Sequence, residues 1–339
     1  MKTAFLFPGQ GAQHVGMGKD LYEAFAAARR VFDLAAEASG LPLRELCFDG
    51  PETELARTDV CQPAIFTVSA AVLACMDGLL DPPQVLAMRP DYMAGLSLGE
   101  YTALYAADMI DFADVLRLVA RRGAAMQAAA TAVPSGMLAV VGLDEAKAGE
   151  LCRSAAEGQV LACANFNCPG QVVLSGQIEA CRRAEAQAPG FGASAAKMLD
   201  VAGAFHSRIM APAAEQLCEA LDAAGFRAPR GRPPSGDRAA LAEPEMGQEF
   251  ASDRTEVISN VEAMPYGCPC RAKQLLVAQL TSPVRWQQSM EYMLAQGVER
   301  FYEVGPGRVL AGLMRRINRK AEVICLNSVK AVENLLAGE

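Results

Sequence analysis

The sequence predicts an α/β protein, in which a mostly parallel sheet is flanked by helices and a smaller unit is inserted. Three observations predict this class. Apolar runs of strand length alternate with amphipathic segments of helix length along most of the chain. Residues 91–106 read as the end of a buried strand, a tight turn between glycines and a helix. From Gly136 the order becomes β-α-β-β-α-β, the pattern of a ferredoxin-like unit.

The larger unit is predicted over residues 1–131 and 198–339. Its first strand is F-L-F at residues 5–7, before a glycine-rich turn, and apolar runs predict later strands at residues 257–260, 301–304 and 323–326. Helical periodicity predicts helices at residues 21–39, 62–79, 111–127 and 271–280, with others ending at about residues 225 and 320. Residues of about 228–255 are rich in proline, glycine and charge, which predicts a long exposed loop.

The smaller unit is predicted over residues 132–197. Its expected strands lie at residues 137–141, 159–164, 171–175 and 194–199, and its helices at residues 144–156 and 177–188. The loop N-F-N-C-P-G joins the two middle strands. We therefore expect a ferredoxin-like subdomain set into a hydrolase-like larger one.

Composition excludes several classes of protein. The chain has 339 residues, 52% of them hydrophobic, and a net charge of −8 without a basic tail, which argues against nucleic acid as a partner. No apolar run reaches the length of a membrane span, so we expect no membrane association. Eleven cysteines at irregular spacing predict a reducing compartment. The N-terminal apolar stretch is too short for a signal peptide, so we expect the protein in the cytoplasm. Two histidines and a single close cysteine pair predict no metal site.

A candidate nucleophile stands in the turn G-L-S-L-G at residues 95–99. Glycines let the backbone turn tightly, and the turn presents the Ser97 hydroxyl outside the sheet, as in a nucleophile elbow. The helix that follows directs free N–H groups at the same place, so an oxyanion there would meet the amide of Leu98. A glycine-rich turn with a capping serine explains this motif equally well when it is taken alone. Only His14 and His206 can serve as imidazole bases.

Seven motifs in a fixed order make a more specific assignment. They are F-P-G-Q-G-A-Q at residues 7–13, G-L-S-L-G-E-Y at 95–101, R-R-G-A-A-M-Q at 121–127, N-F-N-C-P-G-Q-V-V at 165–173, G-A-F-H-S at 203–207, Q-L-T-S-P-V-R-W at 279–286 and E-V-G-P-G at 303–307. Together they resemble the malonyl-CoA:acyl carrier protein transacylases of fatty acid or polyketide synthesis. The resemblance covers nearly the whole chain apart from residues of about 228–255.

The resemblance implies a covalent mechanism. Ser97 would be the nucleophile and His206 the base that takes its proton. A carbonyl oxygen around Gln279, instead of the carboxylate of a hydrolase triad, would orient His206. The backbone N–H groups of Gln10 and Leu98 would form the oxyanion hole.

The resemblance also implies the substrates, which are malonyl-CoA and phosphopantetheinylated acyl carrier protein, with no cofactor bound permanently. Arg122 would clamp the malonyl carboxylate, since a planar guanidinium can bind it bidentately. Asn165 and Asn167 correspond to residues near the pantetheine arm. Phe205 would fill the space that a 2-methyl group needs, so we expect malonyl to be preferred over methylmalonyl.

Two positions depart from the common pattern of these transacylases. Leu96 stands where histidine usually precedes the nucleophile, and Gly203 stands where polyketide versions that select malonyl usually have histidine. Two other functions stay open at this point. A serine esterase or thioesterase built on the same elbow would give net hydrolysis, and a non-catalytic subunit would only bind the carrier protein.

Overall fold

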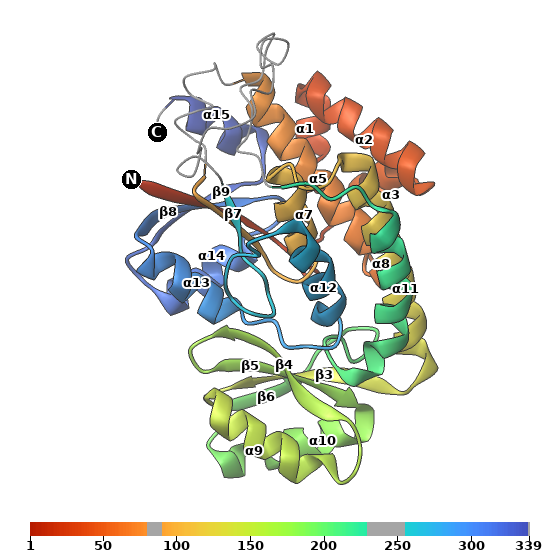
Figure 1. Cartoon of the computed structure of the whole chain (residues 1–339), viewed down its shortest axis with the longest axis vertical. Helices are drawn as coiled ribbons and strands as arrows, with labels where there is room; N and C mark the ends of the chain where they lie inside the picture. Colours follow the sequence, from red (N-terminus) through yellow and green to blue (C-terminus); the bar gives the residue numbers. More distant parts are fainter. Residues whose placement is uncertain (80–89, 229–254, 338–339) are drawn as a thin grey trace.

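The protein has two parts, each built on its own β-sheet. A computed structural model describes residues 1–79, 90–228 and 255–337. The larger part lies at the top of Figure 1, and the smaller part, from β3 to β6, lies below it. The exposed loop predicted for residues 228–255 falls almost wholly outside the described residues, and the division of the chain at residues 132 and 197 stays a prediction.

The larger sheet is parallel throughout. Its order is β7 (Glu256–Val257), β2 (Tyr92–Gly95), β1 (Lys2–Phe7), β8 (Val298–Val304) and β9 (Glu322–Leu326). Every adjacent pair of these strands runs in the same direction. Parallel sheets are normally covered by helices on both faces. The parallel order of these strands confirms the predicted α/β class.

The central strand β1 contributes side chains to a hydrophobic core on each face of the sheet. Phe5 and Phe7 join one buried cluster with residues of α2, α5, α7 and α8, whereas Ala4 and Leu6 join another with residues of α13 and α14. This follows from the strand period, because successive side chains point to opposite faces. The elbow at the end of β2, beside β1, is therefore held between two packed layers.

The helices of the larger part include several that the periodicity did not predict. Before the smaller part they are α1 (Lys19–Ala24), α2 (Ala26–Ser39), α3 (Leu43–Asp49), α4 (Glu52–Leu55), α5 (Thr58–Leu79), α7 (Gly99–Ala106) and α8 (Phe112–Ala132). After it they are α11 (Ala211–Ala223), α12 (Pro269–Gln279), α13 (Trp286–Ala295), α14 (Val309–Ile317) and α15 (Val329–Ala337). The short helices α3 and α4 and the terminal helix α15 were not expected.

The helix predicted at residues 21–39 is wrong, since it is two helices that meet at Phe25. Phe25 has extended backbone angles, with φ −118° and ψ 127°. The Arg29 guanidinium donates to the carbonyls of Tyr22 and Glu23 at 2.9 and 3.0 Å. These carbonyls lie in the last turn of α1, where no helical N–H satisfies them, so the arginine caps the break.

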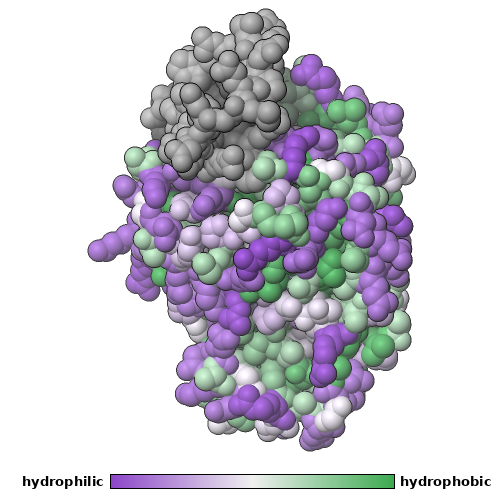
Figure 2. All heavy atoms as spheres, in the orientation of Figure 1, coloured by the Kyte–Doolittle hydropathy of each residue, from purple (hydrophilic) through white to green (hydrophobic). Residues whose placement is uncertain are grey.

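Helix α5 is a core helix. It is long and apolar enough to cross a membrane by those two criteria alone, yet 89% of its most apolar window is buried inside the fold. It packs between the larger sheet and helices α2 and α8. On the face shown in Figure 2, hydrophilic and hydrophobic side chains of the described residues are interspersed, as on the surface of a globular protein.

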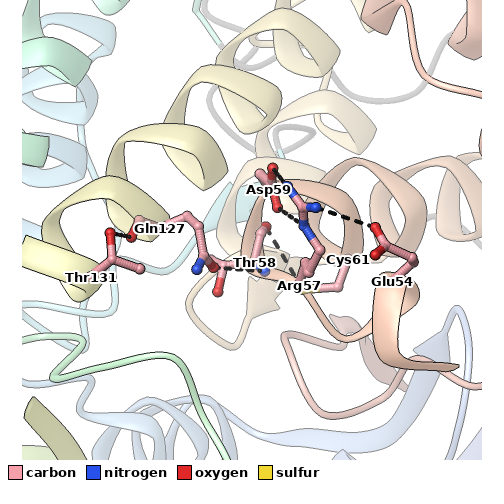
Figure 3. Close-up of polar contacts among 7 residues, drawn as sticks. All are labelled: Glu54, Arg57, Thr58, Asp59, Cys61, Gln127 and Thr131. Atoms are coloured by element: carbon pink, nitrogen blue, oxygen red, sulfur yellow. Dashed lines mark hydrogen bonds and ion pairs between the residues drawn. The ribbon is translucent and has the colours of Figure 1, made fainter.

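One hydrogen bond ties the start of α5 to α8, and Figure 3 shows it together with the neighbouring ion pairs of Arg57. The Thr58 amide donates to the side chain of Gln127 at 3.3 Å. Beside it the Arg57 guanidinium donates to both carboxylate oxygens of Asp59, at 3.2 and 2.8 Å, and to Glu54 at 3.3 Å. The hydrogen bond between Thr58 and Gln127 holds α8 against α5 in the part of α8 that carries Arg122.

The smaller sheet has the strand order β4-β5-β3-β6 and is antiparallel. Its strands are β3 (Ser135–Val141), β4 (Leu161–Cys168), β5 (Gln171–Gln177) and β6 (Ala195–Met198), and its helices are α9 (Glu145–Ala156) and α10 (Ile178–Gln187). This is the predicted ferredoxin-like pattern. The two helices lie on one side of the sheet, away from the larger part (Figure 1).

The predicted loop N-F-N-C-P-G is mostly strand, which corrects its prediction. Residues 165–168 belong to β4, because Asn165, Phe166 and Cys168 continue its pairing with β5. Val284 of the larger part also pairs with the strand at Asn165. The Val284 amide donates to Ala164 at 2.8 Å, and the Phe166 amide donates to Val284 at 2.9 Å. This pairing joins the smaller sheet to the larger part next to the candidate site.

Candidate active site

The elbow forms as the glycine spacing predicts. Strand β2 ends at Gly95, α7 begins at Gly99, and Ser97 between them has a φ of 52°. A Cβ on Gly95 would lie 1.8 Å from the Gly99 carbonyl carbon, and a Cβ on Gly99 would lie 2.1 Å from the Phe7 oxygen. Only glycine fits at both positions, so the two glycines let the turn pack directly against β1.

Ser97 and His206 form a dyad oriented by a backbone carbonyl. Ser97 Oγ lies 2.8 Å from His206 Nε2, and His206 Nδ1 lies 2.7 Å from the Gln279 carbonyl oxygen. Because a carbonyl only accepts, Nδ1 carries the ring proton and Nε2 offers its lone pair to the serine hydroxyl. His206 also has a positive φ, 57°, so both residues of the dyad hold a backbone conformation that is unfavourable outside glycine.

The surroundings of His206 favour its neutral form. Burial, together with the neighbouring positive charge of Arg122, lowers the pKa of His206 to about 4, and the hydrogen bond to Gln279 opposes this shift only in part. A neutral imidazole is the form that can take a proton from Ser97. At neutral pH the His206 ring is therefore in the form that a general base requires.

This pKa predicts how the reactivity of Ser97 depends on pH. We expect the rate of labelling by a fluorophosphonate probe to stay flat from pH 8 to about pH 5 and to fall as the pH passes through about 4. The sign follows because His206 becomes charged below its own pKa and can no longer accept the proton. Circular dichroism at each pH checks that the fold persists. A midpoint near the ordinary histidine value of about 6.5 would contradict the prediction.

Arg122 lies beside the dyad on α8 and is 1% exposed. Its Nη1 donates to Gln62 at 2.7 Å, and its Nη2 donates to Ser97 Oγ at 3.0 Å and to Gln279 Oε1 at 2.9 Å. Burial lowers the pKa of Arg122 from its usual value, although a guanidinium remains charged in proteins. Among the described residues, no carboxylate lies within ion-pair distance of this buried cation, which suits it to an anionic substrate group.

The tight packing of α8 explains how Arg122 reaches the site. A Cβ on Gly123 would lie 2.7 Å from the Thr58 carbonyl oxygen. The glycine lets α8 approach α5 closely, and the side chain of Gln62 on α5 then accepts a hydrogen bond from the Arg122 guanidinium. Because Gly123 directly follows Arg122, the close contact of α8 with α5 places the charged Arg122 side chain where these two core helices meet.

The two residues of the predicted oxyanion hole line the same cavity as Ser97. They are Gln10 and Leu98, and neither of their N–H groups donates a hydrogen bond to another described residue. Unpaired amides beside a nucleophile can stabilise an oxyanion. The role of Gln10 and Leu98 as an oxyanion hole stays a prediction.

The cavity in front of Ser97 has a volume of about 230 Å³. Asn165 and Asn167 reach it from β4, and Phe205 reaches it from the segment that carries His206. Asn167 Oδ1 is buried and has no hydrogen-bond donor among the described residues, so it is free to accept from a ligand. Most of the remaining lining is apolar: Leu96, Met126, Met137, Val173, Leu199, Val201, Val309 and Leu313.

The departure at Gly203 has a steric cause. A Cβ at this position would lie 2.6 Å from Ala130 Cβ and 3.0 Å from Ser135 Oγ. A histidine side chain therefore does not fit here unless α8 moves. His14, the other candidate base, lies in the turn before α1, where its Nδ1 is 3.4 Å from the Ala12 carbonyl, and it does not line the cavity.

We expect Gly203→Ala to destabilise the fold by roughly 1–3 kcal/mol, because the added methyl group overpacks against α8. Chemical denaturation measures this change. Gly149→Ala is the matched control, since Gly149 lies inside α9 with only an arginine side chain, at 3.5 Å, near the added Cβ. That control should be neutral or stabilising, by up to about 1 kcal/mol. Equal effects of the two substitutions would contradict the steric explanation.

Sequence reasoning missed two residues that hold the elbow from behind. Asn260 follows β7, accepts from the Ser97 amide at 2.7 Å and donates to the Gly95 carbonyl at 2.7 Å. Glu100, in the first turn of α7, is fully buried and accepts from the Asn260 amide at 3.1 Å. A charged residue within the buried, apolar start of α7 was the available signal for Glu100.

Comparisons with known proteins agree with this geometry. The acyl transferase domain family matches residues 4–324. The chain is 39% identical over 333 residues to the malonyl CoA-acyl carrier protein transacylase of Bacillus subtilis, with 98% of this chain and 95% of that protein covered. It resembles the solved acyl-carrier-protein-S-malonyltransferase of Bartonella henselae at a TM-score of 0.88 and 38% identity, covering 100% and 99% of the two chains. It also resembles, at a TM-score of 0.86 and 34% identity over all of both chains, a malonyl-transacylase solved in complex with a type II PKS acyl-carrier protein. The chain therefore belongs to the acyl transferase family, among its malonyl-CoA:acyl carrier protein transacylases.

Proposed function

We propose that this protein transfers a malonyl group from malonyl-CoA to the phosphopantetheine thiol of an acyl carrier protein, through a malonyl ester of Ser97. One observation carries the proposal. Ser97 Oγ lies 2.8 Å from His206 Nε2 and 3.0 Å from Arg122 Nη2, so a base and a carboxylate-binding cation flank one nucleophile.

The first half of the reaction forms the acyl-enzyme. His206 Nε2 takes the proton from Ser97 as Oγ attacks the thioester carbonyl carbon. The carbonyl oxygen becomes an oxyanion, which the amides of Gln10 and Leu98 stabilise. When the tetrahedral intermediate collapses, the carbon–sulfur bond breaks, and the CoA thiolate leaves with the proton that His206 returns. The carrier thiol then repeats these steps in reverse and releases Ser97.

Arg122 selects the acyl group. In a malonyl thioester one methylene separates the carboxylate from the reacting carbonyl, so a guanidinium that touches Ser97 Oγ is close enough to bind that carboxylate. Neutral acyl chains would leave the buried cation without a counter-charge, which disfavours them. Phe205, which is buried against the cavity, restricts the space beside the methylene and supports a preference for malonyl over methylmalonyl.

The partner is an acyl carrier protein, as in the similar complex of a malonyl-transacylase with a type II PKS acyl-carrier protein. The proposed reaction uses only side chains and amides of this chain, so it involves no cofactor bound permanently. We place it in the cytoplasm, where malonyl-CoA and the free thiol of the carrier can be present together and cysteines stay reduced.

Intact-mass analysis tests the proposal. Mixing the protein with malonyl-CoA should add one malonyl group, and peptide mapping should place it on Ser97. Adding a phosphopantetheinylated carrier protein should remove the group and increase the mass of the carrier by the same amount. Release of free malonate without gain by the carrier would instead identify a thioesterase, and the absence of any adduct would contradict both enzymes.

A further inference from the structure

A buried carboxylate lies behind the candidate site, on the helix that follows Ser97. Glu100 is fully buried, and three donors converge on its oxygens. They are the Tyr266 hydroxyl, the Gln279 side-chain amide and, at 3.1 Å, the Asn260 backbone amide. A buried charge is tolerated only with such partners, so this cluster stabilises a charge that the proposed chemistry does not itself use.

Gln279 connects this carboxylate to both functional side chains. Its Nε2 donates to Glu100 and, at 3.0 Å, to the Ser97 carbonyl oxygen. Its Oε1 accepts from Arg122 Nη2 at 2.9 Å. Its backbone oxygen accepts from His206 Nδ1 at 2.7 Å. Gln279 thus contacts His206, Arg122 and Glu100.

The chemistry of the neighbours allows only one orientation of the Gln279 amide. A carboxylate only accepts hydrogen bonds, and a guanidinium only donates them. If the amide were reversed, its NH₂ group would face Arg122 and its oxygen would face Glu100, and both contacts would be repulsive. Ionised Glu100 therefore acts with the Ser97 carbonyl oxygen to fix the orientation in which Gln279 holds Arg122.

Glu100 also supplies a negative charge near Arg122 without occupying the hydrogen-bond donors of its guanidinium. Its negative charge favours the charged form of Arg122 and so opposes the effect of burial on that pKa. A carboxylate in direct contact with Arg122 would compete with the substrate for the same donors. One that acts through Gln279 balances the charge without occupying them.

We propose that Glu100 is a positioning residue for malonyl selectivity, which fixes the Gln279 amide and thereby holds Arg122 ready for the carboxylate of the substrate. This inference rests on the proposed function. It assigns the glutamate of G-L-S-L-G-E a task beyond its contact with Asn260, which together with the glycines holds the turn.

The test compares the rates at which malonyl-CoA and acetyl-CoA acylate Ser97, measured by intact mass at pH 8. Burial raises the pKa of Glu100 to about 7, so the carboxylate is mostly ionised at this pH. Glu100→Gln keeps the shape of the side chain and removes its charge. We expect the malonyl-to-acetyl rate ratio to fall about 10-fold or more, as for a lost charged hydrogen bond, with a smaller change in the acetyl rate.

A double-mutant cycle shows whether the effect passes through Arg122. In an Arg122→Ala background, Glu100→Gln should leave the malonyl-to-acetyl ratio unchanged, because the group that it positions is gone. Glu303→Gln is the matched control. Glu303 is also fully buried, but its carboxylate accepts from the Leu310 and Ala311 amides at 2.9 and 2.8 Å and makes no hydrogen bond to Gln279, so the malonyl-to-acetyl ratio of this variant should equal that of the wild type.

Tyr266→Phe provides a second variant that removes only one oxygen. It deletes one hydrogen bond to Glu100, and the ratio should fall in the same direction, by about 2- to 10-fold. If Glu100→Gln does not fold, this variant decides the question. An unchanged ratio in the folded variants, or an equal fall of both rates, would overturn the positioning role. A wild-type protein that gains no malonyl group would instead refute the proposed function.

Discussion

Replacing Ser97 with alanine is expected to abolish the malonyl adduct and the transfer of malonyl to the carrier protein. The hydroxyl is the only atom of Ser97 that touches both His206 and Arg122, at 2.8 and 3.0 Å. Alanine leaves the base, the clamp and the amides of the cavity in place but removes the atom that forms the covalent bond. Intact-mass analysis after incubation with malonyl-CoA should show only the unmodified protein.

Ser154→Ala is the matched control for this loss. Ser154 lies on α9 in the smaller part, where its hydroxyl donates to Gln187 at 2.9 Å. That variant should acquire the malonyl group at the wild-type rate. An adduct that survives on Ser97→Ala would sink the assignment, and peptide mapping would then have to identify another nucleophile.

Replacing Arg122 with alanine is expected to reverse the acyl preference without disabling the nucleophile. A charged hydrogen bond contributes roughly 1.5–3 kcal/mol, so malonyl transfer should slow by about 10- to 150-fold. Transfer of acetyl or of a longer neutral chain should rise, or should fall far less, since no desolvated guanidinium remains to be left unpaired. Labelling of Ser97 by a fluorophosphonate probe should persist, because His206 and Gln279 are retained.

Arg117→Ala is the control on the same helix. The Arg117 side chain is 60% exposed and pairs with Asp114 at 2.6 Å, so its removal should leave the acyl preference unchanged. Equal falls of malonyl and acetyl transfer in a folded Arg122→Ala protein would show that Arg122 is not the carboxylate clamp. Arg121 and Arg117 would then be the next positions to test on α8.

Local rules made much of this protein predictable. The G-x-S-x-G spacing predicted the elbow, because two glycines are needed where the turn packs against β1 and this need depends on few neighbours. Apolar runs of strand length predicted the buried strands, and the order of strands and helices predicted the ferredoxin-like pattern. The resemblance, carried by seven ordered motifs, named His206 and Arg122 before their contacts were seen. These are properties of short segments, which the sequence contains in full.

Only the tertiary structure decided what each buried polar group contacts. The His206 ring meets a carbonyl 73 residues along the chain, and the Ser97 amide meets Asn260, 163 residues away. Periodicity carries no information on such pairs, because they depend on how separate elements pack. The same reason explains the error at residues 165–168, where pairing with β5 and with Val284 continues the strand. The break at Phe25, which Arg29 caps, is a local feature that helical periodicity does not show. The sequence by itself determined the segments and the candidate reactive groups. The packing decided the hydrogen bonds that orient them, because a buried donor or acceptor must find its partner wherever the fold places one.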